Sequence, residues 1–190
     1  MEDWIGIDFG SQNAGTTVIV GCRGNKLELD QSVKGASADD FILSVIDQWK
    51  KVTRIFIDAP LSLPAAYFGC GDDFMYRAAD REVSAMSPMF LGGLTARAMR
   101  IADRLRSSGR ECFETYPARV ESEILGYSTP KKKVFQTQPL KEIIEQIEVE
   151  FPLVENRHQY DAIWAWLAGY RHHKGIAKFI GNPKEGVIVI

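Results

Sequence analysis

Four carboxylate residues stand where the surrounding sequence predicts burial. Asp8 follows the apolar run "IGI", Asp58 follows "IFI" directly before an Ala-Pro pair, and Glu114 lies within "CFETY". Asp161 lies in "HQYDAIWAWLAGY", whose other residues are nearly all apolar. A lone buried carboxylate costs several kcal/mol, so each one needs a proton, a basic partner or a cation. Few basic residues stand close by in sequence, and one site at which several carboxylates share divalent cations would account for all four.

The chemistry of such a site follows from its ligands. Hard oxygen donors suit Mg²⁺ or Mn²⁺, and no cluster of His and Cys competes for zinc. Two such ions about 3.5–4 Å apart are the usual arrangement for cutting phosphodiesters by in-line attack. We therefore expect Asp8 to bridge two ions and Asp58 and Asp161 to complete their coordination, while Glu114 orients a ligand or a water molecule.

Each aspartate also has a purely structural interpretation. Asp8 is placed to begin a turn by bonding to the backbone of Gly10 or Ser11, and Asp58 is placed to do the same before Pro60. Asp161 would be favoured by the helix dipole if it stood in a first helical turn. Three such residues at the ends of neighbouring elements favour a shared site over three separate turns.

Composition sets the class of protein. The chain has 190 residues, 45% of them hydrophobic, which predicts a single domain over 1–190 with a substantial core. A net charge of −2 is lower than expected for a protein that coats nucleic acid without specificity. The three cysteines are far apart and odd in number, which argues against a disulfide framework and fits a reducing cytoplasm. No apolar run is long enough to span a bilayer, so we expect no membrane partner.

The order of the elements predicts a fold. Apolar alternation predicts three strands, joined by short links, within the first 33 residues, and the period then changes to a helix over 37–51 with Ser37 as N-cap. Strands at 52–58, 111–117 and 185–190 alternate with helices at 77–84, 92–107, 139–151 and 158–170. Residues 59–76 lack periodicity and read as an irregular loop insertion. Three antiparallel strands followed by alternating helix and strand indicate an α/β mixed sheet with helices on both faces, which is the order of the ribonuclease H-like fold.

A set of short blocks resembles a known family. These blocks are "GIDFG…AGTTV", "IDAPLSLP", "RAADREV", "FETYPARV", "YDAIWAWLAGY" and "EGVIVI", and they are spread in order over nearly the whole chain. In this order they resemble the domain-of-unknown-function 429 family, a group of predicted nucleases with a ribonuclease H-like fold. The resemblance implies Asp8, Asp58 and Asp161 as the metal-binding acidic set, with Glu114 as a fourth carboxylate. It supplies no substrate beyond nucleic acid.

Basic residues are the candidates for substrate binding. In "RAADREV", Arg77 and Arg81 are four residues apart and share a helical face, which would suit a phosphate; the alternative is a ladder of ion pairs around Asp80. Lys132, in the centre of "KKK", is a candidate contact to a nucleic-acid backbone, and the alternative is a solvated surface. His158 stands near Asp161 and is either a site residue or a surface residue at a helix start.

Two other functions compete with a nuclease. "GIDFGSQNAGTT" resembles the first phosphate loop of the actin and sugar-kinase group of ATPases, but that group needs two such domains and this chain is too short for them. The second is a non-catalytic binding module that keeps the fold. The apolar loop around Tyr67 and Phe68 indicates either a homodimer contact or a substrate lid.

Overall fold

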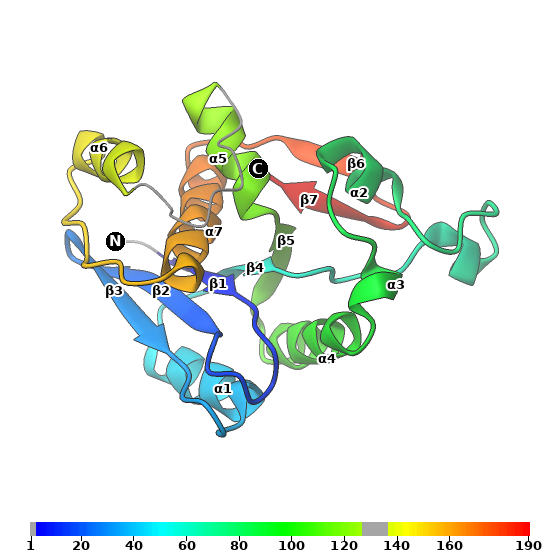
Figure 1. Ribbon diagram of the computed structural model, residues 1–190, viewed down its shortest axis with the longest axis horizontal. Coiled ribbons are helices and arrows are strands. Elements are labelled where there is room, and N and C mark those ends of the chain that lie inside the picture. The colour runs from blue at the N-terminus through cyan, green and yellow to red at the C-terminus, as the bar shows by residue number, and fades with distance from the viewer. Residues whose placement is uncertain (1–2, 127–136) are drawn as a thin grey trace.

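The computed structural model describes residues 3–126 and 137–190. Its seven strands form one sheet in the order β3-β2-β1-β4-β5-β7-β6 (Figure 1). The strands are β1 (Trp4–Asp8), β2 (Val18–Arg23), β3 (Lys26–Gln31), β4 (Arg54–Asp58), β5 (Glu111–Thr115), β6 (Phe179–Asn182) and β7 (Gly186–Val189). The first three strands pair antiparallel, β1, β4, β5 and β7 pair parallel, and β6 returns antiparallel to β7. The predicted α/β mixed sheet of the ribonuclease H-like order is confirmed.

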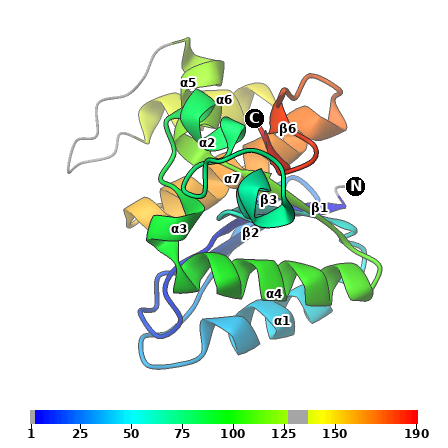
Figure 2. The same cartoon turned by 90° about the vertical axis from the view of Figure 1, so that its right-hand side faces the viewer.

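Helices cover both faces of the sheet (Figures 1 and 2). The helices are α1 (Ala38–Gln48), α2 (Ala78–Val83), α3 (Pro88–Leu91), α4 (Gly93–Ser107), α5 (Pro117–Leu125), α6 (Gln138–Gln146) and α7 (Arg157–His173). We call the side covered by α1 and α4 the α4 face, and the side covered by α7, α5 and α6 the α7 face; α2 packs against β6 and β7 at the edge of the sheet. Each face has its own buried apolar cluster, because successive side chains of a strand point to opposite sides of the sheet.

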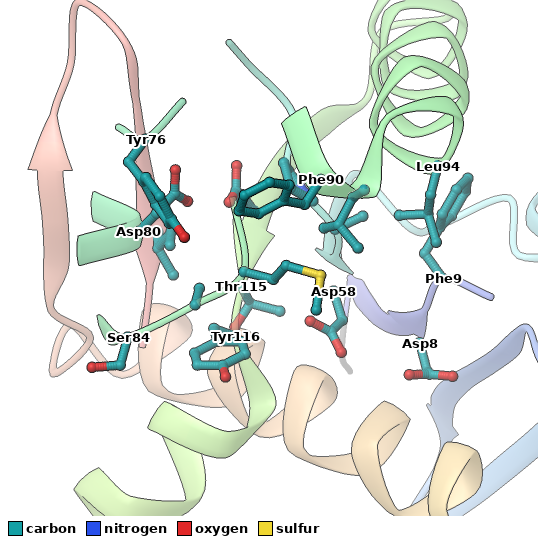
Figure 3. A pocket seen from close by; sticks show the side chains of 17 residues that line it. Asp8, Phe9, Asp58, Tyr76, Asp80, Ser84, Phe90, Leu94, Thr115 and Tyr116 are labelled. Carbon is teal, nitrogen blue, oxygen red and sulfur yellow. The ribbon is translucent and has the colours of Figure 1, made fainter. Parts of the chain in front are cut away.

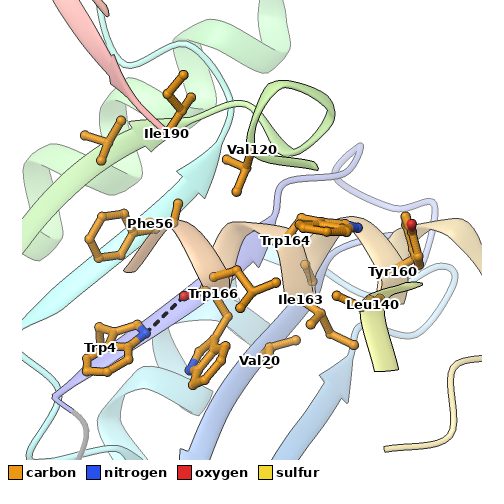
Figure 4. Close-up of a cluster of buried hydrophobic side chains, with 14 of the residues drawn as sticks. Trp4, Val20, Phe56, Val120, Leu140, Tyr160, Ile163, Trp164, Trp166 and Ile190 are labelled. Carbon is orange, nitrogen blue, oxygen red and sulfur yellow. Dashed lines mark hydrogen bonds between the residues drawn. The ribbon is translucent and has the colours of Figure 1, made fainter. Parts of the chain in front are cut away.

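Helix α7 lies directly against β1, and two glycines permit this approach. A Cβ atom on Gly6 would lie 2.2 Å from the backbone nitrogen of Trp166, and one on Gly169 would lie 2.2 Å from the Trp4 ring. The Trp4 indole donates a hydrogen bond of 3.1 Å to the carbonyl of Trp166, which Figure 4 shows within the buried cluster of the α7 face. Because α7 is fixed on β1 in this way, its first turns lie over the end of the strand that carries Asp8.

Most predicted elements are present, and Ser37 accepts a hydrogen bond from the Asp40 amide as the predicted N-cap. The predicted helix over 139–151 is shorter, since α6 ends at Gln146 and residue Glu150 instead bonds to the edge of β3 through Asn25 and Leu27. Those backbone groups at the sheet edge offer the chain an alternative to further helical bonds.

Three elements lack a prediction, and they are the short helix α3, helix α5 and strand β6. Helix α5 starts at Pro117, which occupies the first helical turn, and the preceding strand already ends at Thr115. Strand β6 has four residues, among them Gly181 with a φ of 107°, so its sequence carries no alternating pattern. Within the predicted irregular loop, Ala65–Phe68 form a 3-10 turn.

Two further observations bear on the sequence-based expectations. Cys22, Cys70 and Cys112 form no disulfide in the described part of the chain. No helix in the described parts of the chain is long and apolar enough to cross a membrane.

A carboxylate cluster beside an apolar pocket

Asp8 and Asp58 lie side by side at the carboxyl ends of the two central parallel strands. They are direct partners in the register between β1 and β4, and neighbouring strands lie about 4.8 Å apart. Gly6 faces α7 and Phe56 belongs to the cluster of the α7 face. Because side chains two residues apart leave a strand on the same side, Asp8 and Asp58 also point to the α7 face. Their backbone register thus brings two carboxylates together.

Helix α7 supplies the third carboxylate. The side chain of Asp161 is 18% exposed, and its Oδ2 atom accepts a hydrogen bond of 2.9 Å from Arg157, one turn earlier. Its Oδ1 atom is buried and accepts no hydrogen bond from the described residues, although Arg157 Nε lies 2.9 Å from it. This buried oxygen therefore has an ion-pair contact with Arg157 but no hydrogen bond of good geometry.

His158 also belongs to this site. Its Nδ1 atom lies 2.9 Å from Oδ2 of Asp8, and it stands three residues before Asp161, on the same side of the helix. This hydrogen bond raises the pKa of His158 above its ordinary value. The sequence leaves His158 as either a site residue or a surface residue. The structure places its ring against the carboxylate of Asp8.

Burial raises the pKa of all three aspartates, and the charge of other carboxylates raises it further at Asp58 and Asp161. The pKa of Asp58 is well above its ordinary value, first because of burial and then because of the charges of Asp8, Asp161 and Glu114. Burial raises the pKa of Asp161 to about 6, against the opposing effect of Arg157. It also raises the pKa of Asp8, against the opposing effect of His158. In the described structure no side chain donates a hydrogen bond to Asp58. The site holds more negative charge than its two basic neighbours balance.

Glu114 has a different environment. It is the register partner of Ile57, which belongs to the cluster of the α4 face, so its side chain leaves β5 on the side opposite to Asp58. Its two oxygens accept hydrogen bonds of 2.6 and 2.7 Å from Arg77, and the amide of Leu61 donates a third of 2.8 Å. A role for Glu114 in orienting a ligand or water would require it to leave these bonds.

Arg77 lies inside the protein. It is 0% exposed, and its guanidinium bonds to Asp80 (Nε to Oδ2, 3.0 Å) as well as to Glu114. Buried in this way, Arg77 does not reach a substrate, which corrects the expectation of a phosphate contact. The alternative from the sequence, an ion pair with Asp80, is the observed arrangement. The pair fixes the loop before α2 against β5.

The other two basic candidates differ from each other. Arg81 is exposed, pairs with Asp73 and stacks over the Tyr76 ring at 4.5 Å. It therefore does not share a face with Arg77 for phosphate binding. Lys132 lies outside the described residues.

A pocket of about 600 Å³ opens beside Asp8 and Asp58 (Figure 3). Its walls are largely apolar and aromatic. The side chains that Figure 3 labels around it are Asp8, Phe9, Asp58, Tyr76, Asp80, Ser84, Phe90, Leu94, Thr115 and Tyr116. Burial and the charges of Asp58 and Asp161 raise the pKa of Tyr116, which places its ring next to the carboxylates. The pocket could therefore hold an apolar, flat group beside the charged centre.

The carboxylates of Asp8, Asp58 and Asp161 are suitable ligands for a hard divalent cation. A bound cation would replace the contacts that Arg157 and His158 now make with two of them. No three His, Cys, Asp or Glu side chains within residues 3–126 and 137–190 are arranged as a ready metal site. Arg157 and His158 instead hold one oxygen each of Asp161 and Asp8. The unbonded Oδ1 of Asp161 and the crowded Asp58 are the oxygen donors that Mg²⁺ and Mn²⁺ prefer.

Comparison with known proteins gives one structural match. The fold is similar to the Thermus thermophilus RuvC structure, with a TM-score of 0.52 and 14% sequence identity, covering 98% of this chain and 99% of that one. RuvC is a nuclease with the ribonuclease H-like fold, and the chain shares that fold. No family model matches the sequence, and no curated protein does.

Two residues of the site have no firm assignment from the sequence. Arg157 carries no expectation, and His158 is expected either in the site or at the surface of a helix start. The available signal was helical spacing, since residues three and four positions before Asp161 must lie on its side of the helix. The partner of His158 on β1 is 150 residues away in sequence, and only the packing of α7 reveals it.

Proposed function

We propose that this protein is a nuclease that hydrolyses phosphodiester bonds of nucleic acid and depends on Mg²⁺ or Mn²⁺. The observation that carries the proposal is the side-by-side placement of Asp8 and Asp58 at the ends of β1 and β4, with Asp161 facing them from α7. The ribonuclease H-like fold, shared with a nuclease over nearly the whole chain, supports it.

In this proposal Asp8, Asp58 and Asp161 hold the metal ions. When bound, such ions supply a nucleophile by lowering the pKa of water and stabilise the leaving oxygen. Strand β1 pairs with β4 and packs against α7, which favours Asp8 as the shared ligand. Glu114 and Arg77 act as positioning residues, because their buried ion pair fixes the loop after β4 and so the end of the strand that carries Asp58.

Arg157 and His158 act on the metal-free site in this proposal. Each contacts a carboxylate that would bind a cation, so together they neutralise part of the negative charge when no metal is bound. His158 is also within reach to hold Asp8 in one orientation or to move a proton at its Nδ1 atom. The side-chain exposure of 43% at both residues leaves them room to turn away.

The test is a cleavage assay with labelled single-stranded, double-stranded, hybrid and branched substrates in Mg²⁺ or Mn²⁺. We expect cleavage that is lost with EDTA and with Asp8→Asn. Asp103→Asn is the matched control, because it removes one carboxylate from the exposed side of α4. Cleavage that survives in Asp8→Asn would refute the assigned centre, and the absence of cleavage with every substrate would refute the nuclease.

One observation favours a second candidate, a non-catalytic binding module. The ion pairs of Arg157 and His158 already give Asp161 and Asp8 a partner each, as in a structural site. Titration calorimetry with Mn²⁺ separates the two functions. A nuclease centre binds the ion near neutral pH and loses it with Asp8→Asn, whereas a binding module of this kind takes up none.

Three further assignments belong to the proposal. The order of the sequence blocks supports membership of the domain-of-unknown-function 429 family. The odd number and wide spacing of the cysteines support a cytoplasmic location. The exposed aromatic residues at the pocket support contact with the substrate rather than a homodimer.

A further inference from the structure

An aromatic wall stands on the side of the pocket away from Asp8. It consists of Tyr76 and Phe90, whose ring centroids are 6.1 Å apart at an interplanar angle of 81°. Phe90 is 65% exposed, and Met86 beside it is 59% exposed. Figure 3 shows the rings of Tyr76 and Phe90 on one side of the pocket and the ring of Tyr116 on the other. A flat group that entered here would meet aromatic rings on both sides.

The exposure of this wall is unusual. Single exposed apolar residues are common, but a cluster that borders a concave site indicates an interaction surface. The neighbouring loop adds Tyr67, Phe68 and Phe74, all at least 45% exposed, and the rings of Tyr67 and Phe74 contact each other at 5.3 Å. The loop that leads to Tyr76 therefore carries further exposed aromatic rings.

Buried polar residues hold the wall in place. Ser87 is 0% exposed, donates a hydrogen bond to the Met75 carbonyl and accepts one of 3.0 Å from the Met89 amide, which fixes the start of α3. Thr95, 2% exposed, bonds to the Pro88 carbonyl at 2.8 Å. The ring of Phe90 is thus presented to solvent by a rigid backbone, and little ordering is needed when a ligand binds.

We propose that Tyr76, Phe90 and Tyr116 hold an unpaired nucleobase next to the bond that is cut, so that the substrate is nucleic acid that is single-stranded or locally unpaired. Because the rings of Tyr76 and Phe90 are nearly perpendicular, Phe90 stacks on a face of the base and Tyr76 contacts its edge. This inference deepens the proposed nuclease function and rests on it for the position of the phosphate. Every base has a π-face, so stacking on aromatic side chains accepts any sequence. DNA and RNA share this chemistry.

The geometry favours a base over a second copy of the chain. The pocket is concave and ends at Asp8 and Asp58, so its occupant must tolerate carboxylates and bound cations on one side and aromatic rings on the other. A nucleotide has this polarity, with a flat base joined to a phosphate that metal ions attract. In a paired duplex the base is stacked between its neighbours and its faces are not available to the wall.

The experiment measures binding, independently of cleavage. Fluorescein-labelled (dT)15 and (U)15 and a 15-base-pair duplex are titrated with the full chain by fluorescence anisotropy, in Ca²⁺, which takes the same oxygen ligands. We expect the single strands to bind about ten-fold more tightly than the duplex, and Phe90→Ala to weaken them about ten-fold. Phe90→Trp should retain binding, with its fluorescence quenched by the oligonucleotide. Phe179→Ala, which removes a ring 57% exposed on β6, is the matched control and should bind like the wild type.

The outcomes separate the two proposals. Equal binding of duplex and single strand, no binding of either, or wild-type affinity in Phe90→Ala would overturn the base pocket, even if the protein cuts nucleic acid in Mg²⁺. Binding of single strands that depends on Phe90, without cleavage of any substrate, would support the pocket and refute the nuclease. A concentration-dependent dimer that Phe90→Ala disrupts, with no oligonucleotide bound, would assign the wall to a second copy and overturn the inference.

Discussion

The ionised side chain of Asp161 should weaken the metal-free protein, and its replacement by asparagine should stabilise it. Asparagine has nearly the same shape as the protonated carboxyl group and carries no charge. Burial raises the pKa of Asp161 from its ordinary 3.8 to about 6, although Arg157 opposes the change. The folded state therefore binds the proton more tightly than the unfolded chain does. The stabilisation that comes from the proton is complete below pH 3.8 and is lost as the pH rises through about 6.

The magnitude follows from the difference between these two pKa values. The difference is about 2, each pKa unit corresponds to about 1.4 kcal/mol, and ionisation therefore costs the folded state about 3 kcal/mol at pH 8. For a domain of this size that is a rise in Tm of about 6–12 °C for Asp161→Asn at pH 8. At pH 4 the gain should fall below about 1 kcal/mol, since the wild-type carboxyl is then largely protonated in the folded state.

Thermal and urea unfolding in EDTA, at pH values from 4 to 8, measure the effect. Asp103→Asn is the control, because it removes an exposed carboxylate from α4. The reasoning is refuted if Asp161→Asn is no more stable than the wild type at pH 8, or if its advantage does not change with pH. A loss of stability at every pH would mean that the ion pair with Arg157 outweighs the burial of the charge.

Three other changes test the fold and the site. Gly6→Ala should destabilise the protein by about 3 kcal/mol or more, since the new Cβ would lie 2.2 Å from the Trp166 nitrogen. Urea unfolding measures the loss of stability, and an unchanged free energy of unfolding would contradict the close packing of α7 on β1. Arg77→Met should cost about 3–5 kcal/mol because it leaves buried carboxylates unpaired, while Arg81→Met at the surface should change the urea midpoint little. Mg²⁺ binding should weaken as the pH falls from 8 to 6, because the pKa of Asp161 is raised to about 6 and a bound cation must displace its proton. Calorimetry in two buffers should detect this proton release, and an affinity for Mg²⁺ that does not change with pH would contradict the prediction.

The sequence was a good guide to the order of the elements. Apolar alternation and helical periodicity depend on near neighbours in the chain, so the strands that carry Asp8 and Asp58 and the helix that carries Asp161 were all predicted. Strand β6 was missed for the same reason, because its four residues with Gly181 carry no pattern of their own. It forms because β7 offers it hydrogen bonds.

The role of each carboxylate depended on which side of the sheet it faces. Asp58 and Glu114 both end or nearly end a parallel strand, and their local sequences do not separate them. The register of β5 against β4 turns Glu114 toward the α4 face, where Arg77 binds it, and leaves Asp58 next to Asp8. A shift of β5 by one residue would have turned Glu114 to the side of the sheet that Asp58 faces.

By itself the sequence determined the α/β class, the succession of strands and helices, and three aspartates placed at the ends of adjoining elements. Only the tertiary structure decided that His158 contacts Asp8, that Arg77 is buried, and that Phe90 borders the pocket. The physical reason is that periodicity is a local property of the chain, whereas these contacts join residues up to 150 positions apart. They exist because Gly6 lets α7 lie against β1 and because a buried ion pair fixes the loop after β4.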